Sequence, residues 1–146
     1  MNNKALRIVI VDDHLAFSER LMKLLQTLPG VDVVGRASDL DSGRTCVAAL
    51  QPDVAIVDIR LRNASGFEIL AEMKRKWPEM IALMVTAYAD SQYARRSRQL
   101  GADFFFEKSS GIKALLDAIK HLRDGTGLPI MAARGEDLQH EARTIL

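Results

Sequence analysis

The sequence predicts a doubly wound α/β fold in three layers, built on a five-stranded parallel sheet. Short apolar runs rich in Val and Ile alternate five times with longer amphipathic stretches between residues 6 and 123. Runs that are continuously apolar are typical of strands buried on both faces of a parallel sheet. Right-handed crossovers between such strands favour the small form with strand order 2-1-3-4-5.

The elements follow from these runs and from the residues that bound them. Strands are expected at Leu6–Val11, Val31–Ala37, Val54–Asp58, Ile81–Thr86 and Asp103–Phe106. Helices are expected at Ala16–Leu28, Leu40–Leu50, Gly66–Lys76, Ser91–Leu100 and Ile112–Arg123. Ser65 is a candidate N-cap, whereas Pro29 with Gly30 and Gly101 are expected to end the first and fourth helices.

The chain of 146 residues has the size of one domain. We expect that domain at residues 1–124 and a C-terminal tail or linker at 125–146, where Gly and Pro interrupt the pattern. A short final helix is the alternative for this tail, because three apolar residues could share one of its faces: Leu138, Ala142 and Ile145.

Composition and charge exclude several classes of protein. The formal net charge of +1 gives no argument for binding nucleic acid or an acidic membrane surface. The single cysteine, Cys46, cannot form an internal disulfide, and we expect a small buried hydrophobe there. No apolar run reaches the ~18 residues of a membrane-spanning helix. We therefore expect a cytoplasmic protein without membrane contact.

Charged residues stand where the predicted strands end. Asp12 and Asp13 follow the first strand, Asp58 ends the third and Lys108 follows the fifth. The first and third strands are neighbours in this order, so the carboxylates should share one crevice. Clustered carboxylates repel one another unless a cation lies among them, and oxygen ligands favour Mg²⁺. A metal-assisted phosphoryl site is indicated, although an acidic helix start is the alternative for the Asp pair.

Four segments at successive strand ends resemble the receiver domain of two-component response regulators. They are IVIVDDH, PDVAIVDIRLRNASGFEIL, MVTAY and GADFFFEKS, and the resemblance covers residues 5–123 in order and spacing. It implies a flavodoxin-like, receiver-like fold and a phosphoacceptor switch in a phosphorelay. Such a switch is not an enzyme that turns over an external substrate.

The resemblance assigns the acidic residues to phosphoryl transfer. Asp58 would be the phosphoacceptor, because a carboxylate is a competent nucleophile that forms an acyl phosphate. Asp12, Asp13, Asp58 and the backbone carbonyl of Arg60 would hold Mg²⁺. A nearby cation is needed because the transferring group carries negative charge.

The same resemblance assigns the response to phosphorylation. Thr86 and Lys108 would each bind a phosphoryl oxygen, and Phe105 would be the aromatic residue that repacks when the hydroxyl moves inward. Core packing is the alternative for Phe105. Two further residues, Ala87 and Tyr88, occupy positions that tune phosphate lifetime in the family, as does Arg60.

The sequence departs from the family pattern near the site. Ser109 follows Lys108 where proline is usual, which leaves the geometry of that peptide bond open. Arg62 stands where proline is common after the acceptor. His14 follows the acidic pair, and we expect a helix-start residue there rather than a metal ligand.

The resemblance also implies partners. A sensor histidine kinase or a phosphotransfer protein would donate the phosphoryl group, and phosphorylation would promote pairing of two copies or binding of a target. The candidate partner face carries basic residues of the last two helices: Arg95, Arg96, Arg98, Lys113 and Lys120. An ordinary solvated face is the alternative for these charges.

Several functions compete with a stand-alone receiver. The segments also resemble receivers that precede helix-turn-helix output domains, so this one could belong to a DNA-binding transcriptional regulator without itself touching nucleic acid. A non-phosphorylated scaffold is a further alternative. An aspartyl-phosphate hydrolase would need a second Asp where Arg60 stands, and a nucleotide-binding module would need a Gly-rich loop after the first strand.

Overall fold

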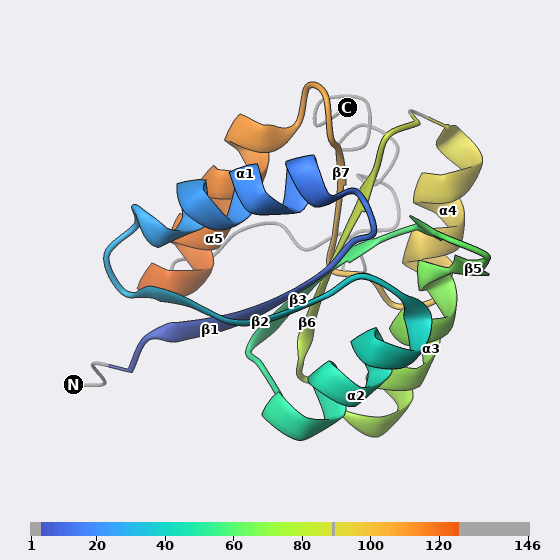
Figure 1. The fold of residues 1–146 in the computed structure, drawn as a ribbon, viewed down its shortest axis with the longest axis horizontal. Helices are drawn as coiled ribbons and strands as arrows, with labels where there is room; N and C mark the ends of the chain where they lie inside the picture. Colours follow the sequence, from blue (N-terminus) through green and yellow to red (C-terminus); the bar gives the residue numbers. More distant parts are fainter. Residues whose placement is uncertain (1–3, 89, 126–146) are drawn as a thin grey trace.

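A five-stranded parallel sheet lies between two layers of helices (Figure 1). The computed structural model describes residues 4–88 and 90–125. Its strands are β1 (Leu6–Val11), β2 (Val31–Ala37), β3 (Val54–Asp58), β6 (Ile81–Thr86) and β7 (Phe104–Glu107), in the order β2-β1-β3-β6-β7. Its helices are α1 (Leu15–Gln26), α2 (Leu40–Leu50), α3 (Gly66–Lys76), α4 (Ser91–Gln99) and α5 (Ile112–Asp124). The predicted fold class and strand order are confirmed.

The boundaries of three helices, α1, α4 and α5, differ from the predictions by one or two residues. The predicted end of the first helix at Leu28 is wrong: α1 ends at Gln26, and the amides of Thr27 and Leu28 bond three residues back in a tighter last turn ahead of Pro29. α4 stops one residue early, and α5 runs one residue further to Gly125, whose left-handed backbone (φ 72°) caps it. The rest of the predicted tail lies outside the described residues.

The start of β7 one residue later than predicted has a structural cause. Asp103 does not join the strand, because its carboxylate accepts a hydrogen bond from Ala82 N and lies 2.7 Å from Lys74 Nζ. The same ammonium donates to Met80 O at 2.7 Å. This part-buried ion pair fixes the start of β7, at the end of the sheet opposite the acidic residues.

A small antiparallel hairpin was not predicted. It pairs β4 (Arg60–Leu61) with β5 (Ala64–Ser65), and Asn63 adopts positive φ in its turn. The hairpin leads directly into α3, where the Ser65 hydroxyl accepts a hydrogen bond from Phe67 N. The predicted N-cap is therefore confirmed, and the hairpin sets the position of α3 beside the end of β3.

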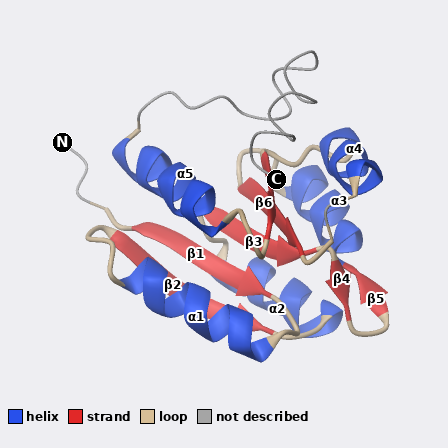
Figure 2. Cartoon of the chain, turned by 90° about the horizontal axis from the view of Figure 1, so that it is seen from above, coloured by secondary structure: helices blue, strands red, loops and turns tan. Residues whose placement is uncertain are grey.

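Two hydrophobic cores fill the space between the sheet and the helices on its two faces. Helices α1 and α5 cover one face of the sheet, and α2, α3 and α4 cover the other (Figures 1 and 2). Every residue of β3 is buried, as expected for the central strand. Cys46 is partly buried against the α2–α3–α4 core, and its burial raises the pKa of the thiol. Within the described ranges no helix is long and apolar enough to cross a bilayer.

Candidate functional site

The three predicted acidic residues meet at the carboxyl ends of β1 and β3. One carboxylate oxygen from each of Asp12, Asp13 and Asp58 lies within 4.8 Å of the others. Asp12 and Asp58 are buried, with exposed fractions of 2% and 4%, whereas Asp13 is partly exposed. The parallel pairing of β1 with β3, in which Val11 faces Val57, brings them together. A cluster of this kind concentrates negative charge in a poorly solvated place.

Lys108 compensates part of this charge. Its Nζ lies 2.8 Å from Asp12 Oδ2 and 3.0 Å from Asp58 Oδ2, to which it donates a hydrogen bond. The backbone amide of Lys108 donates to Thr86 O at 2.8 Å, which fixes the end of β7 against the end of β6. One ammonium therefore serves two buried carboxylates, which already outweigh it, and the third carboxylate adds to the excess negative charge.

The two carboxylate oxygens of Asp12 have different surroundings. Oδ1 accepts a hydrogen bond from His14 N at 2.7 Å and so shapes the start of α1. Oδ2 is buried and, among the described residues, receives no aligned hydrogen bond, although Lys108 Nζ is close to it. His14 is the residue at the start of α1, as expected, and its ring stacks on Phe17. Asp12 thus shapes the helix start through one oxygen and faces the Lys108 ammonium with the other.

The backbone around Asp58 is tightly packed. Arg60 N donates to Asp58 Oδ1 at 3.2 Å, and Gly66 N donates to Ile59 O at 2.7 Å. A Cβ placed on Gly66 would lie 1.9 Å from Asp58 O, so only glycine allows α3 to begin here. Sequence reasoning did not single out Gly66. The available signal was its position directly after the capping Ser65, where a glycine as the first residue of a helix indicates close backbone contact.

The environment of Asp58 disfavours its charged form. Burial is the largest cause and the negative charge of Asp12 the second, and together they raise the pKa of Asp58 from 3.8 to about 6. The Lys108 ammonium and the Arg60 amide act in the opposite direction. A cation added to the cluster would favour the charged carboxylate.

Thr86 and Phe105 lie on the neighbouring strands. Thr86 is fully buried at the end of β6, and its hydroxyl accepts a hydrogen bond from Tyr88 N at 3.1 Å. Phe105 is 1% exposed and packs in the α2–α3–α4 core beside Met84 of β6. Phe105 is therefore a core residue on β7, the strand next to the one that carries Thr86.

The positions expected to tune phosphate lifetime lie at the ends of β3 and β6. The Arg60 guanidinium stacks on the ring of Tyr88, with 4.9 Å between Cζ and the ring centroid. Ala87 is exposed beside them. The Lys108–Ser109 bond is trans, since no cis peptide bond occurs among the described residues.

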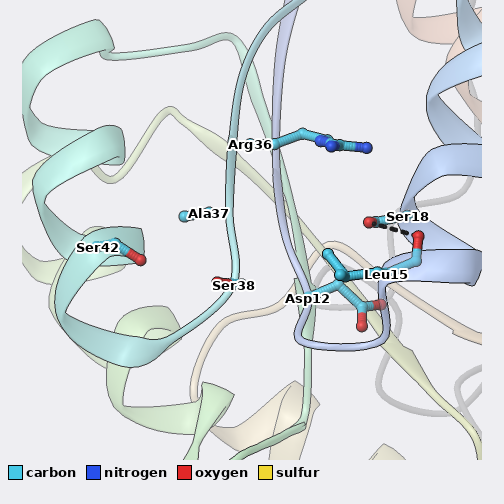
Figure 3. A pocket seen from close by; sticks show the side chains of 7 residues that line it. All are labelled: Asp12, Leu15, Ser18, Arg36, Ala37, Ser38 and Ser42. Carbon is cyan, nitrogen blue, oxygen red and sulfur yellow. Dashed lines mark hydrogen bonds between the residues drawn. The ribbon is translucent and has the colours of Figure 1, made fainter.

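Two hollows, which share Leu15 and Ser38, open beside the acidic cluster. One of about 330 Å³ lies between α1 and the end of β2, and Figure 3 shows Asp12, Leu15 and Arg36 on its walls. The second, of about 320 Å³, is lined by Asp13, Leu15 and Arg62, among others. The side chain of Leu15 is 60% exposed and belongs to both. The cluster is therefore accessible from solvent on this side.

The basic residues of the candidate partner face lie on α4 and α5, which flank the edge strand β7. Four of them are exposed and Arg98 is partly exposed; the exposed ones are Arg95, Arg96, Lys113 and Lys120.

Comparison with known proteins adds independent evidence. Residues 8–120 match the family model described as the response regulator receiver domain. The chain is 27% identical to the transcriptional regulatory protein DegU of Brevibacillus brevis over 125 residues, which are 86% of this chain and 53% of that protein. It is 30% identical to the DNA-binding transcriptional activator DevR/DosR of Mycobacterium tuberculosis over 84% of this chain and 56% of that protein. The chain spans about half the length of these curated relatives.

Solved structures agree in fold. The signal receiver domain of the putative response regulator NarL from Mycobacterium tuberculosis matches with a TM-score of 0.75 and 28% identity, over 84% of this chain and 98% of that one. A CheY-like receiver domain protein from Methanospirillum hungatei JF-1 matches with a TM-score of 0.70 and 29% identity, over 84% and 96%. Together with the match over residues 8–120, these findings show that the chain belongs to the receiver domain family of two-component response regulators.

Proposed function

We propose that this chain is a phosphorylation-dependent switch in which Asp58 accepts a phosphoryl group from phosphohistidine. The observation that carries the proposal is the position of the Asp58 carboxylate, buried between the carboxylates of Asp12 and Asp13 and the ammonium of Lys108. One cation would be enough to pair a single buried carboxylate, whereas three clustered carboxylates at strand ends suit a nucleophile that works beside a metal ion.

The donor set fits Mg²⁺. Three carboxylates lie within 4.8 Å of one another, and the buried Oδ2 of Asp12 has no aligned hydrogen bond from any described residue. Asp12, Asp13, Asp58 and the backbone carbonyl of Arg60 would hold the ion, which prefers oxygen ligands. When bound, Mg²⁺ offsets the negative charge that gathers on the transferring phosphoryl group.

The transfer step uses residues already in place. A carboxylate oxygen of Asp58 bonds to phosphorus while the P–N bond of the donor breaks. The electron pair of that bond passes to the imidazole nitrogen, which takes up a proton. The Lys108 ammonium, 3.0 Å from the acceptor, then pairs with a phosphoryl oxygen. The Thr86 hydroxyl would donate to another phosphoryl oxygen.

The response would travel through β6, β7 and α4. Phe105 packs beside β6, so movement of Thr86 would change the space around its ring. Only Ala94 and Ser97 of α4 are buried, and the buried Ser97 hydroxyl has no hydrogen-bond partner among the described residues. Besides these, the partly buried Tyr93 packs edge-on against Phe67 of α3, so α4 has few core contacts to rearrange when it moves. We propose that phosphorylation repositions α4 and thereby changes the partner face.

The chain would work in the cytoplasm, where the donor would be a sensor histidine kinase or a phosphotransfer protein and a second phosphorylated copy is a candidate partner. Relatives named as transcriptional regulators support the alternative that the receiver serves a DNA-binding protein. In either setting the chain would work as a switch rather than as an enzyme with an external substrate.

The acceptor assignment predicts a specific gain in mass. Incubation with Mg²⁺ and a small acyl-phosphate donor should add one phosphoryl group to the wild type and none to Asp58→Asn, as measured by intact mass spectrometry. The control is Asp117→Asn, which changes a half-exposed carboxylate of α5 and should be modified like the wild type. Equal modification of wild type and Asp58→Asn would refute the assignment.

The raised pKa of Asp58 predicts a pH-dependent stability difference. Because the folded-state pKa is about 6, above the ordinary value of 3.8, protonation favours folding and this contribution is lost as pH rises through about 6. Without Mg²⁺, Asp58→Asn should exceed wild type at pH 8 by about 1–3 kcal/mol in free energy of unfolding, since one pKa unit corresponds to about 1.4 kcal/mol.

Urea unfolding between pH 4 and 8 measures this difference. It should shrink as pH falls below about 6, and saturating Mg²⁺ should reduce it at pH 8 by stabilising only the wild type. A difference in free energy of unfolding that stays constant over this pH range would show that the pKa of Asp58 is not raised in the folded protein.

The stack of Arg60 on Tyr88 predicts slow loss of the phosphoryl group. The two side chains join the ends of β3 and β6 next to the acceptor, so we expect them to hinder the approach of water. Arg60→Ala and Tyr88→Ala should each shorten the acyl-phosphate lifetime several-fold, with little further effect in the double variant. Tyr88→Phe keeps the ring and should behave like wild type. Longer lifetimes in both alanine variants would contradict this direction.

The partner face predicts a role for the exposed charges of α4. Reversal of Arg95 and Arg96 to Glu should weaken the phosphorylation-dependent association of two copies. Sedimentation velocity of the protein with and without beryllium fluoride measures this association. Arg75→Glu reverses an exposed charge on α3, distant from that face in sequence, and serves as the control. Unchanged association in the α4 variant would place the interface elsewhere.

A further inference from the structure

Phe17 contacts the charged centre of the site from the first turns of α1. Its ring centroid lies 4.7 Å from Lys108 Nζ, and its side chain is 8% exposed. The ring also stacks with that of His14, with 6.5 Å between centroids and an interplanar angle of 17°. Phe17 therefore connects α1 to the ammonium that serves both buried carboxylates.

The ring completes the surroundings of that ammonium. Of the three N–H donors of the ammonium, one bonds to Asp58 Oδ2, and Asp12 Oδ2 lies 2.8 Å away as an ion-pair partner. The side chain of Lys108 is only 8% exposed, so water has little access to the remaining direction. The electron-rich face of an aromatic ring attracts a cation, and the attraction is larger when the pair is desolvated.

The carboxylate partners of Lys108 both change during the proposed reaction. Asp12 would share with the metal ion the oxygen that now pairs with Lys108, and Asp58 would become an acyl phosphate. The ring of Phe17 is the neighbour that keeps its chemistry throughout. We infer that Phe17 is a positioning residue for phosphoryl transfer: its ring face holds the Lys108 ammonium in reach of the acceptor and then of the phosphoryl group. This inference rests on the proposed function.

Ordinary core packing is the competing explanation, because Phe17 also belongs to the α1–α5 core. The two explanations differ in what they require of the ring. Packing needs only its shape and apolar surface, whereas attraction of the ammonium needs the negative charge of its face. Fluorine substituents withdraw that charge with little change in shape, so they separate the two.

The experiment places 4-fluoro-, 3,5-difluoro- and 3,4,5-trifluorophenylalanine site-specifically at position 17 of the full chain. The rate of Asp58 phosphorylation by a small acyl phosphate is followed by intact mass at saturating Mg²⁺. Each fluorine should lower the rate, to a total of about 10-fold for the trifluoro ring, as expected for loss of a desolvated cation–π contact of ~1–2 kcal/mol. Mg²⁺ affinity, measured by calorimetry, should stay within about 2-fold.

Two controls isolate the contact. The same series at Phe104, which is 3% exposed in the same core, should leave the rate unchanged. In a Lys108→Ala background, where no ammonium faces the ring, the midpoint of thermal unfolding without metal should not depend on fluorination at position 17. In the presence of Lys108 that midpoint should fall stepwise with each fluorine.

The outcomes distinguish this inference from the proposed function. A flat series at position 17, in a protein that is phosphorylated at Asp58, would overturn the role of Phe17 and leave a packing residue. Failure of the unsubstituted protein to accept a phosphoryl group would instead refute the proposed function. In that case the unfolding series, which needs no transfer, still decides whether the ring holds the ammonium.

Discussion

Charge balance around one buried ammonium is the constraint on which the site depends. Lys108 lies within 3.0 Å of the carboxylates of both Asp12 and Asp58, and Asp13 adds a third acidic group that it does not contact. Burial makes this imbalance costly, as the raised pKa of Asp58 shows. A divalent cation, and then a phosphoryl group, would each change the balance, which makes the cluster responsive to both.

The fold holds this cluster in place through the backbone rather than through long side chains. The parallel register of β1 and β3 sets the carboxylates side by side, and the Lys108 amide bonds to Thr86 O at the end of β6. The start of α3 fits against Asp58 O only because residue 66 is glycine. By contrast, α4 buries only Ala94 and Ser97. α3, which begins beside the acceptor, buries four residues, so the helix next to the site is more firmly packed than α4.

The parts of the molecule that sequence predicted are those governed by local pattern. Continuous apolar runs gave the strands, and acidic residues at their ends gave the cluster, because strand order alone determines which ends are adjacent. The hairpin Arg60–Ser65 escaped prediction since two-residue strands show no periodicity. Gly66 and Phe17 escaped because their importance lies in contacts with Asp58 O and Lys108 Nζ that only the three-dimensional structure reveals.

Titration of Mg²⁺ by calorimetry tests most directly whether the acidic cluster is a cation site. Asp13 is the residue to change, because it is partly exposed and its replacement by Asn leaves the Lys108 ion pairs intact. We predict one Mg²⁺ bound per wild-type chain and affinity at least about tenfold weaker in Asp13→Asn. Asp117→Asn, remote from the cluster on α5, should bind as the wild type does. Equal affinity in wild type and Asp13→Asn would show that the three carboxylates do not form the metal site.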